Sequence, residues 1–123
     1  MPYTIFKDFT FAAAHHIPDH PGKCRFLHGH NYKVRVHLRA AELDRIGMVL
    51  DFAELKRLTE EVVGIWDHQV INQFPPFDHL PPTAEMLTSH IFEEMSKRLA
   101  DPRVQVAKVE VWESETSCAI YEP

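Results

Sequence analysis

The sequence predicts an α+β fold in which an antiparallel four-stranded sheet carries two helices on one face. Segments with strand character occur in runs at both ends of the chain, and two segments with helical spacing follow one another between them. Strands and helices separated along the chain in this way favour a sheet whose helices gather on one face. We expect residues 1–123 to form a single domain, because this length leaves no room for a second core.

The first expected strand covers residues 3–14 and leads into a pair of histidines. Alternate side chains of a strand share a face, and this rule continues one face to His15 and turns His16 the other way. Prolines and a glycine then predict a loop over residues 17–27. We expect this loop to bring Cys24 into the neighbourhood of His15.

The second expected strand begins with the sequence His28-Gly29-His30. Polar and apolar side chains alternate strictly over residues 31–39, which is the signature of a strand. Side chains two positions apart point the same way, so His28 and His30 can bind one ion, and Gly29 between them adds no bulk.

Two histidines make an incomplete metal site. A catalytic zinc ion usually takes three ligands from protein and keeps its fourth position for water or substrate. The candidates for the third ligand are His15, His16 and His20, and we choose His15 because it continues the face of the first strand. A lone histidine is more often a surface or core residue, but the pattern predicts Zn²⁺ bound by His15, His28 and His30.

A turn over residues 42–47 and a short strand over residues 48–50 are expected next. Asp51 then has the side chain of a good helix N-cap, and Glu54 three residues later completes a capping-box pattern. The buried face of this helix is marked by apolar residues at helical spacing, namely Phe52, Leu55, Leu58, Val62 and Ile65.

Four prolines between residues 69 and 82 exclude regular structure and predict a connector. Thr83 is expected to cap a second helix that ends before Asp101. The inner face of this helix is expected to carry Leu87, Ile91, Met95 and Leu99. Two strands, over residues 104–113 and 116–121, close the chain.

Composition is that of a cytoplasmic globular protein, with 45% hydrophobic and 25% charged residues. No apolar run approaches the roughly 20 residues that span a bilayer, and the first residues lack the apolar region of a signal peptide, so we expect no membrane partner. The net charge of −5 argues against nucleic acid as a partner. Cys24 and Cys118 are not expected to pair in a reducing compartment, and Cys118 is interpreted as a small buried hydrophobe.

Six short motifs occur in order over nearly the whole chain. They are Phe11-Ala12-Ala13-Ala14-His15, Cys24-x-x-x-His28-Gly29-His30-Asn31-Tyr32, Leu50-Asp51-Phe52-x-x-Leu55-Lys56, Trp66-Asp67-His68, Pro82-Thr83-x-Glu85 and Trp112-Glu113-Ser114. Together they resemble the 6-pyruvoyltetrahydropterin synthase family. The short gap between Cys24 and His28 is similar to the 6-carboxytetrahydropterin synthase branch, which serves queuosine and related deazapurine pathways, whereas the pyruvoyl-forming branch usually has a longer gap.

The resemblance implies the tunnelling fold, in which sheets of three subunits join edge to edge into a barrel and two such trimers stack as a homohexamer, with active sites between subunits. The implied substrate is 7,8-dihydroneopterin triphosphate, and the implied products are 6-carboxy-5,6,7,8-tetrahydropterin, acetaldehyde and triphosphate. Pyruvoyl formation and pterin side-chain cleavage at the same site are alternatives within the enzyme class. A closed Cys/His metal-binding module without turnover is the alternative from another class.

The resemblance also implies roles in proton transfer. Cys24 is the expected general acid or base, because a nearby cation favours the thiolate; an inert cysteine and a fourth zinc ligand are the alternatives. Asp67 and His68 form a second proton-handling pair, in which the carboxylate orients the imidazole and stabilises its charged form.

Substrate contacts follow from the same resemblance. Glu113 is the expected pterin anchor, because a carboxylate accepts two parallel hydrogen bonds from a ring N–H and its neighbouring amino group. Thr83 and Glu85 match family positions near the pterin, but roles at the start of the second helix explain them equally well.

An overall negative charge does not attract a triphosphate, so local cations must do so. We expect a cationic patch at the pocket mouth made of Lys23 and Arg25, with Lys33, Arg35 or Arg39 from the polar face of the second strand as further members.

Overall fold

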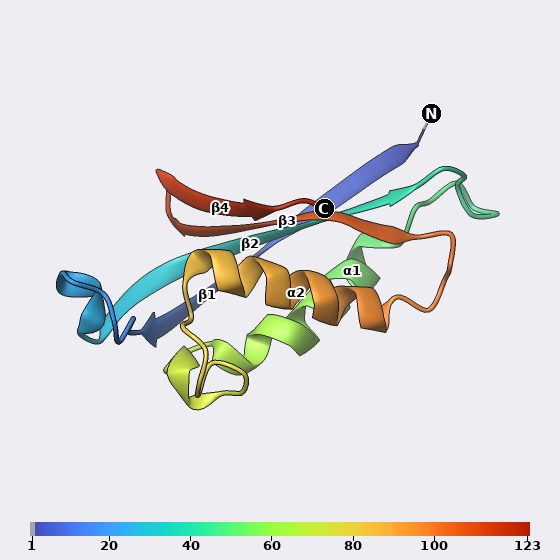
Figure 1. The fold of residues 1–123 in the computed structure, drawn as a ribbon. Coiled ribbons are helices and arrows are strands. Elements are labelled where there is room, and N and C mark those ends of the chain that lie inside the picture. Colours follow the sequence, from blue (N-terminus) through green and yellow to red (C-terminus); the bar gives the residue numbers. More distant parts are fainter. Residues whose placement is uncertain (1) are drawn as a thin grey trace.

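The computed structural model describes residues 2–123 and shows four antiparallel strands with two helices beneath one face of the sheet (Figure 1). The strands lie in sequence order and are β1 (Tyr3–His15), β2 (His28–Ala40), β3 (Gln105–Ser114) and β4 (Ser117–Tyr121). The helices are α1 (Phe52–Val63) and α2 (Ala84–Arg98), and three short 3-10 turns are Lys23–Arg25, Gly64–Trp66 and Ile71–Gln73. The predicted α+β class with helices on one face is confirmed.

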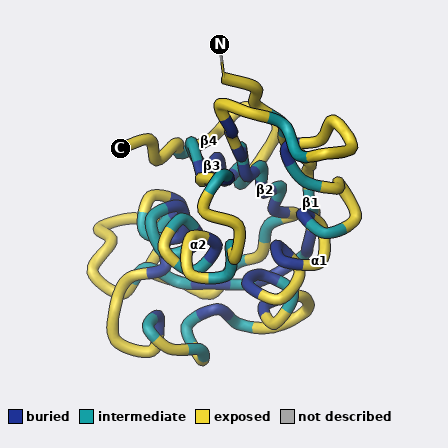
Figure 2. Tube along the Cα trace, turned by 90° about the vertical axis from the view of Figure 1, so that its right-hand side faces the viewer, coloured by how far each residue is buried: buried dark blue, intermediate teal, exposed yellow. Residues whose placement is uncertain are grey.

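The core lies between the sheet and the helices, where Figure 2 shows the buried segments facing inward. Every second residue of β2 from Tyr32 to Ala40 is buried on this side. The helices bury the residues that their spacing predicted, which are Leu55, Leu58 and Val62 from α1 and Leu87, Ile91 and Met95 from α2. Burying such a side chain fully contributes about 1.5 to 3 kcal/mol, so these residues hold the helices against the sheet.

Both helices begin at the predicted caps. The Asp51 carboxylate accepts a hydrogen bond from the Ala53 N–H at 2.7 Å, and the Thr83 hydroxyl accepts one from the Met86 N–H at 3.1 Å. Each bond satisfies a donor that the first turn of a helix leaves free. The capping-box role of Glu54 is wrong, because its carboxylate turns instead to the Arg57 guanidinium.

Two residues predicted in the buried face of α1 are exposed, Phe52 by 52% and Ile65 by 53%. Phe52 is the first residue of the helix and lies at its exposed end, whereas Ile65 lies in the 3-10 turn that follows Val63 and no longer keeps the helical period. Leu99 is the C-cap of α2 and packs only partly buried against the core.

Residues 48–50 are irregular, with a bend at Val49 and Leu50, so the short strand predicted there is wrong. Their backbone groups bond elsewhere: the Met48 N–H donates to the Asp44 carboxylate, and the Arg103 guanidinium donates to the carbonyls of Met48 and Val49. No strand partner is needed for these groups.

The opposite face of the sheet is polar, and its charges pair across strands. Arg35 on β2 donates two hydrogen bonds to the Asp8 carboxylate on β1, at 2.7 and 3.0 Å. Cys118 on β4 pairs in register with Trp112 and is exposed, so its predicted burial is wrong. Within residues 2–123 no helix is long and apolar enough to cross a membrane.

Candidate functional site

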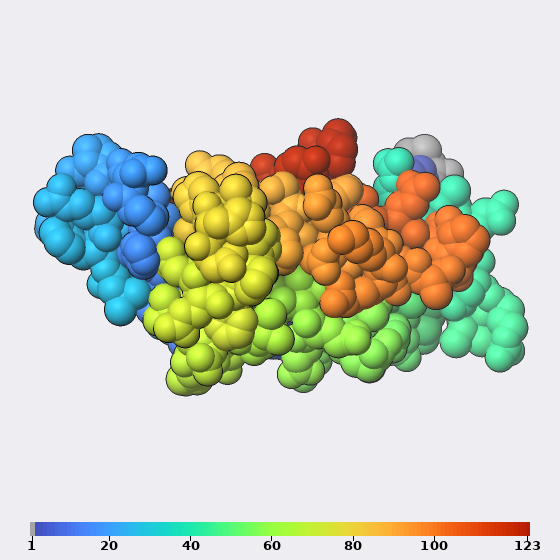
Figure 3. Space-filling model, turned by 60° about the horizontal axis from the view of Figure 1, so that its bottom comes forward, coloured from blue at the N-terminus to red at the C-terminus, as the bar shows by residue number. Residues whose placement is uncertain are grey.

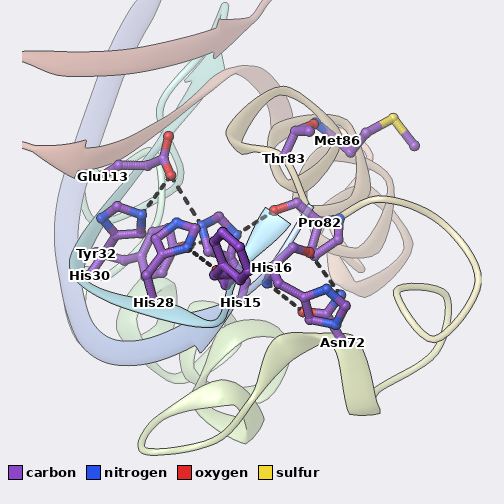
Figure 4. Close-up of polar contacts among 11 residues, drawn as sticks. His15, His16, His28, His30, Tyr32, Asn72, Pro82, Thr83, Met86 and Glu113 are labelled. Atoms are coloured by element: carbon purple, nitrogen blue, oxygen red, sulfur yellow. Dashed lines mark hydrogen bonds and ion pairs between the residues drawn. The ribbon is translucent and has the colours of Figure 1, made fainter. Parts of the chain in front are cut away.

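Three histidine rings meet where β1 ends and β2 begins. The strand register pairs His15 with His28 and Ala13 with His30, so the rings of all three histidines lie on the core side of the sheet. One ring nitrogen of each lies within 4.8 Å of the other two, and His15 is only 2% exposed (Figure 4). The structure therefore brings together the three residues predicted as metal ligands.

Backbone carbonyls orient two of these rings. The Nδ1 atom of His15 lies 2.8 Å from the Pro82 carbonyl oxygen, and that of His28 lies 2.8 Å from the Phe26 carbonyl oxygen. A carbonyl can only accept a hydrogen bond, so each Nδ1 carries the proton and each Nε2 presents a lone pair. The Tyr32 hydroxyl also approaches His15 Nδ1, at 3.1 Å. This is the arrangement by which proteins fix the tautomer of a ligating histidine.

The arrangement of the three rings suits the binding of a metal ion. The Nε2 atoms of His15 and His30 are buried without a hydrogen-bond partner, whereas buried polar atoms nearly always have one. Burial lowers the pKa of His30, against the opposing charge of Glu113, and so favours the neutral form that can bind a cation. Three imidazoles suit zinc, copper, iron or nickel, and leave a fourth position of a tetrahedral ion free.

Glu113, near the end of β3, points its carboxylate at the same rings. Its Oε2 atom lies 3.0 Å from His30 Nε2 and 3.4 Å from His15 Nε2. Glu113 also lines a pocket together with His30, Lys33 and Trp112.

Asn72 holds the backbone next to His15, a role that no sequence pattern predicted. Its side-chain amide donates to the His16 carbonyl and its side-chain oxygen accepts from the His16 N–H, both at 3.0 Å. His16 itself is outside the group of converging rings, as the alternation of β1 predicted. An asparagine in a proline-rich connector reads as an ordinary loop residue, and only the folded path of the chain brings it to the end of β1.

Comparison with known proteins identifies the family. Residues 4–123 match the family model described as 6-pyruvoyl tetrahydropterin synthase. The chain belongs to this family. A Synechocystis protein named 6-carboxy-5,6,7,8-tetrahydropterin synthase is 36% identical over 124 residues, which are 97% of this chain and 92% of that protein. A Poecilia reticulata protein named 6-pyruvoyl tetrahydrobiopterin synthase is 34% identical over 104 residues, 81% of this chain and 69% of its own.

Among solved structures, the Caenorhabditis elegans 6-pyruvoyl tetrahydropterin synthase matches with a TM-score of 0.88 at 28% identity, covering all 100% of this chain and 96% of that one. The resemblance drawn from the six sequence motifs is confirmed, and so is the subunit fold that it implied, a four-stranded antiparallel sheet with two helices on one face.

Cys24 lies in the 3-10 turn Lys23–Arg25, half-buried and free. Its carbonyl accepts a hydrogen bond from the Ile17 N–H at 2.7 Å, which holds the turn to the end of β1. Figure 3 shows this loop, in blue, protruding at one end of the molecule. Among the described residues 2–123, the thiol is not part of the converging group, which disfavours the alternative of Cys24 as a fourth ligand.

Asp67 and His68 form the predicted pair. The Asp67 carboxylate lies 3.0 Å from His68 Nδ1 and also accepts the Ala12 N–H at 3.0 Å. The Ala12 hydrogen bond is the main reason why the pKa of Asp67 falls below its usual value. His68 is held at φ 60° and its ring is 81% exposed, facing a pocket that also reaches His30. The ring is thus presented outward with a carboxylate behind it.

The remaining predicted substrate contacts lie on α2, in the protruding loop and on β2. Thr83 caps α2, and Glu85 lies exposed in the first turn of that helix. Of the expected cationic patch, Lys23 and Arg25 are exposed in the protruding loop. Arg39 is exposed further along β2, and Arg35 is committed to Asp8. Lys33 alone among the β2 cations lines the pocket at Glu113, where its ammonium group lies 4.5 Å from the Trp112 ring centroid.

Proposed function

We propose that this protein converts 7,8-dihydroneopterin triphosphate to 6-carboxy-5,6,7,8-tetrahydropterin, with release of acetaldehyde and triphosphate, in queuosine or related 7-deazapurine biosynthesis in the cytoplasm. One observation carries the proposal: in a chain of this family, the ring nitrogens of His15, His28 and His30 lie within 4.8 Å of one another. When bound there, Zn²⁺ would act as a Lewis acid that lowers the pKa of the substrate's side-chain hydroxyls and adjacent C–H groups.

Other side chains in this part of the molecule can bind the substrate and transfer protons. Glu113 can hold the pterin through paired hydrogen bonds to its ring N–H and amino group. Cys24 and the Asp67–His68 pair offer two groups that can act as general acid or base. Lys33, which lines the same pocket as Glu113, offers a cation for an anionic part of the substrate.

A homohexamer made of two trimers is part of the proposal. β1 and β4 are the two edges of the sheet, and joining them between copies would close it into a barrel. Phe26 and Leu27, next to Cys24, are 60% and 61% exposed, which fits a loop covered by a neighbouring copy. Cys24 would then serve a site shared between subunits.

The test is to incubate the zinc-loaded protein with 7,8-dihydroneopterin triphosphate and identify the products by mass spectrometry. We expect acetaldehyde and 6-carboxy-5,6,7,8-tetrahydropterin from the parent protein and neither from Cys24→Ala, with one zinc retained per chain in both. A pyruvoyl product, the activity named for the Poecilia relative, would keep the site and change the reaction. Absence of turnover with zinc bound would favour a metal-binding module and refute the proposal.

A further inference from the structure

A second cavity lies between the loop that follows β1 and the proline-rich connector that leads into α2. Its volume is about 560 Å³, within the range of small-molecule sites. Neither the three converging histidines nor Glu113 lines this cavity. Figure 4 shows Glu113 on one side of the histidine rings, and His16 with Asn72, which both line the cavity, on the other. The cavity is therefore separate from the pocket beside Glu113.

The apolar part of the cavity lining is flat and rigid. It consists of Ile17, Pro18, Pro21, Phe77, Leu80 and Pro81. Phe77 is 2% exposed, and its ring packs edge-on against the ring of Trp66 in the core, at 5.8 Å between centroids, so its position is fixed. Proline rings lose almost no conformational freedom when a ligand covers them. Such walls suit a planar, partly apolar ring.

Polar groups of the same lining offer donors and acceptors. His20 Nδ1 accepts a hydrogen bond from the Gly22 N–H at 2.9 Å, so the neutral ring carries its proton on Nε2 as a donor. His79 Nδ1 lies 2.8 Å from an oxygen of the Asp78 carboxylate, which leaves Nε2 of the neutral ring as an acceptor. Within residues 2–123 the Asp19 carboxylate has no hydrogen bond or ion pair, so both of its oxygens can accept. Two such oxygens match two parallel N–H groups of one ligand.

We propose that this cavity is a second ligand site, which binds a planar fused ring with a 2-amino-4-oxopyrimidine edge. This edge is shared by guanine bases and pterins. Its adjacent N–H groups pair with the Asp19 carboxylate, the His20 N–H supplies a donor for its oxo group, and the ring lies against the wall that contains Phe77. The site goes beyond the function proposed above and does not depend on it.

Both walls of the cavity also hold His15. Asn72 lines the cavity and bonds to the backbone of His16, and Pro82, next to the lining residue Thr83, places its carbonyl 2.8 Å from His15 Nδ1. A ligand that bridges the loop and the connector restricts their movement and stabilises this arrangement. Occupation of the cavity should therefore strengthen zinc binding at the histidines, and zinc should strengthen ligand binding by the same factor.

Binding is measured on the full chain by isothermal titration calorimetry with guanosine and with adenosine, which lacks the pair of N–H donors. Guanosine should bind the parent protein at least about 10-fold more tightly than adenosine does. Asp19→Asn, which keeps size and loses charge, should weaken guanosine binding by at least about 10-fold, and Leu80→Trp, which fills the cavity, should abolish it. Glu60→Gln alters an exposed carboxylate on α1 and is the matched control, with unchanged binding.

Glu113→Gln distinguishes this cavity from the proposed pterin site. Guanosine binding should persist in Glu113→Gln; binding that is lost in Glu113→Gln and kept in Asp19→Asn would overturn the proposal. 7,8-Dihydropterin is titrated in the same way, and Asp19-dependent binding of this ring without guanosine binding would assign the site to pterins. Absence of Asp19-dependent binding for both rings would refute it, as would equal affinity for guanosine and adenosine.

The link to His15 is tested by competition for zinc with a chromophoric chelator, with and without saturating guanosine. Guanosine should raise the zinc affinity of the parent protein by about 5-fold and leave that of Asp19→Asn unchanged. Equal zinc affinity of the parent protein with and without bound guanosine would refute the link. None of these measurements requires turnover, so this proposal and the proposed reaction fail separately.

Discussion

Replacing Asn72 by Ala should weaken zinc binding although Asn72 is no ligand. Its side chain makes two hydrogen bonds to the backbone of His16, both at 3.0 Å, and thereby holds the adjacent His15 ring. A hydrogen bond of this kind contributes about 1 kcal/mol net, so about 2 kcal/mol is available in all. If that free energy served only to orient His15, zinc affinity would fall by at most about 30-fold, and we expect about 10-fold.

Zinc dissociation constants are measured by competition with a chromophoric chelator, and the stability of the metal-free protein by urea unfolding. Asp44→Ala is the matched control, because Asp44 also accepts two backbone hydrogen bonds, from Ile46 and Met48 at 3.0 and 2.9 Å, in a turn away from the histidines. It should lower stability and leave zinc affinity unchanged. Equal zinc affinity in Asn72→Ala and the parent protein would show that the two Asn72 hydrogen bonds stabilise only the fold. It would refute the role of Asn72 in orienting His15.

Two further predictions concern charge. Replacing Lys23 and Arg25 together by Ala should raise KM for the triphosphate with little change in kcat, because both cations are exposed beside Cys24; an unchanged KM would remove them from substrate binding. Arg35 holds the pKa of the Asp8 carboxyl below its usual value, so the pair stabilises the fold above about pH 4 and this contribution is lost as pH falls through the lower folded pKa. Urea unfolding of Asp8→Asn should thus show a loss of about 0.5 kcal/mol at pH 7 that disappears once acid pH protonates the folded Asp8 carboxyl, and a loss that is constant with pH would contradict it.

Local pattern was enough to predict most of the elements. Strict alternation along β2 and the period-two extension of β1 assigned His15, rather than His16, to the face of His28 and His30, because the direction of a side chain on a strand depends only on its position. Caps at Asp51 and Thr83 were predictable for a similar reason, since a helix terminus bonds to side chains only a few residues away. The errors at Phe52, Ile65 and residues 48–50 lie at the ends of elements, where neighbouring segments decide burial and pairing.

The sequence by itself thus determined the order of the elements, the family, and the face that carries the three histidines. Only the tertiary structure decided how those histidines are held: the Pro82 carbonyl reaches His15 across 67 residues, and Asn72 reaches His16 across 56. It also decided that Glu113 points at the rings from β3. Such contacts depend on the path of an irregular connector and on the register of the sheet. Neither produces a periodic pattern in the sequence that would identify the contacting residues.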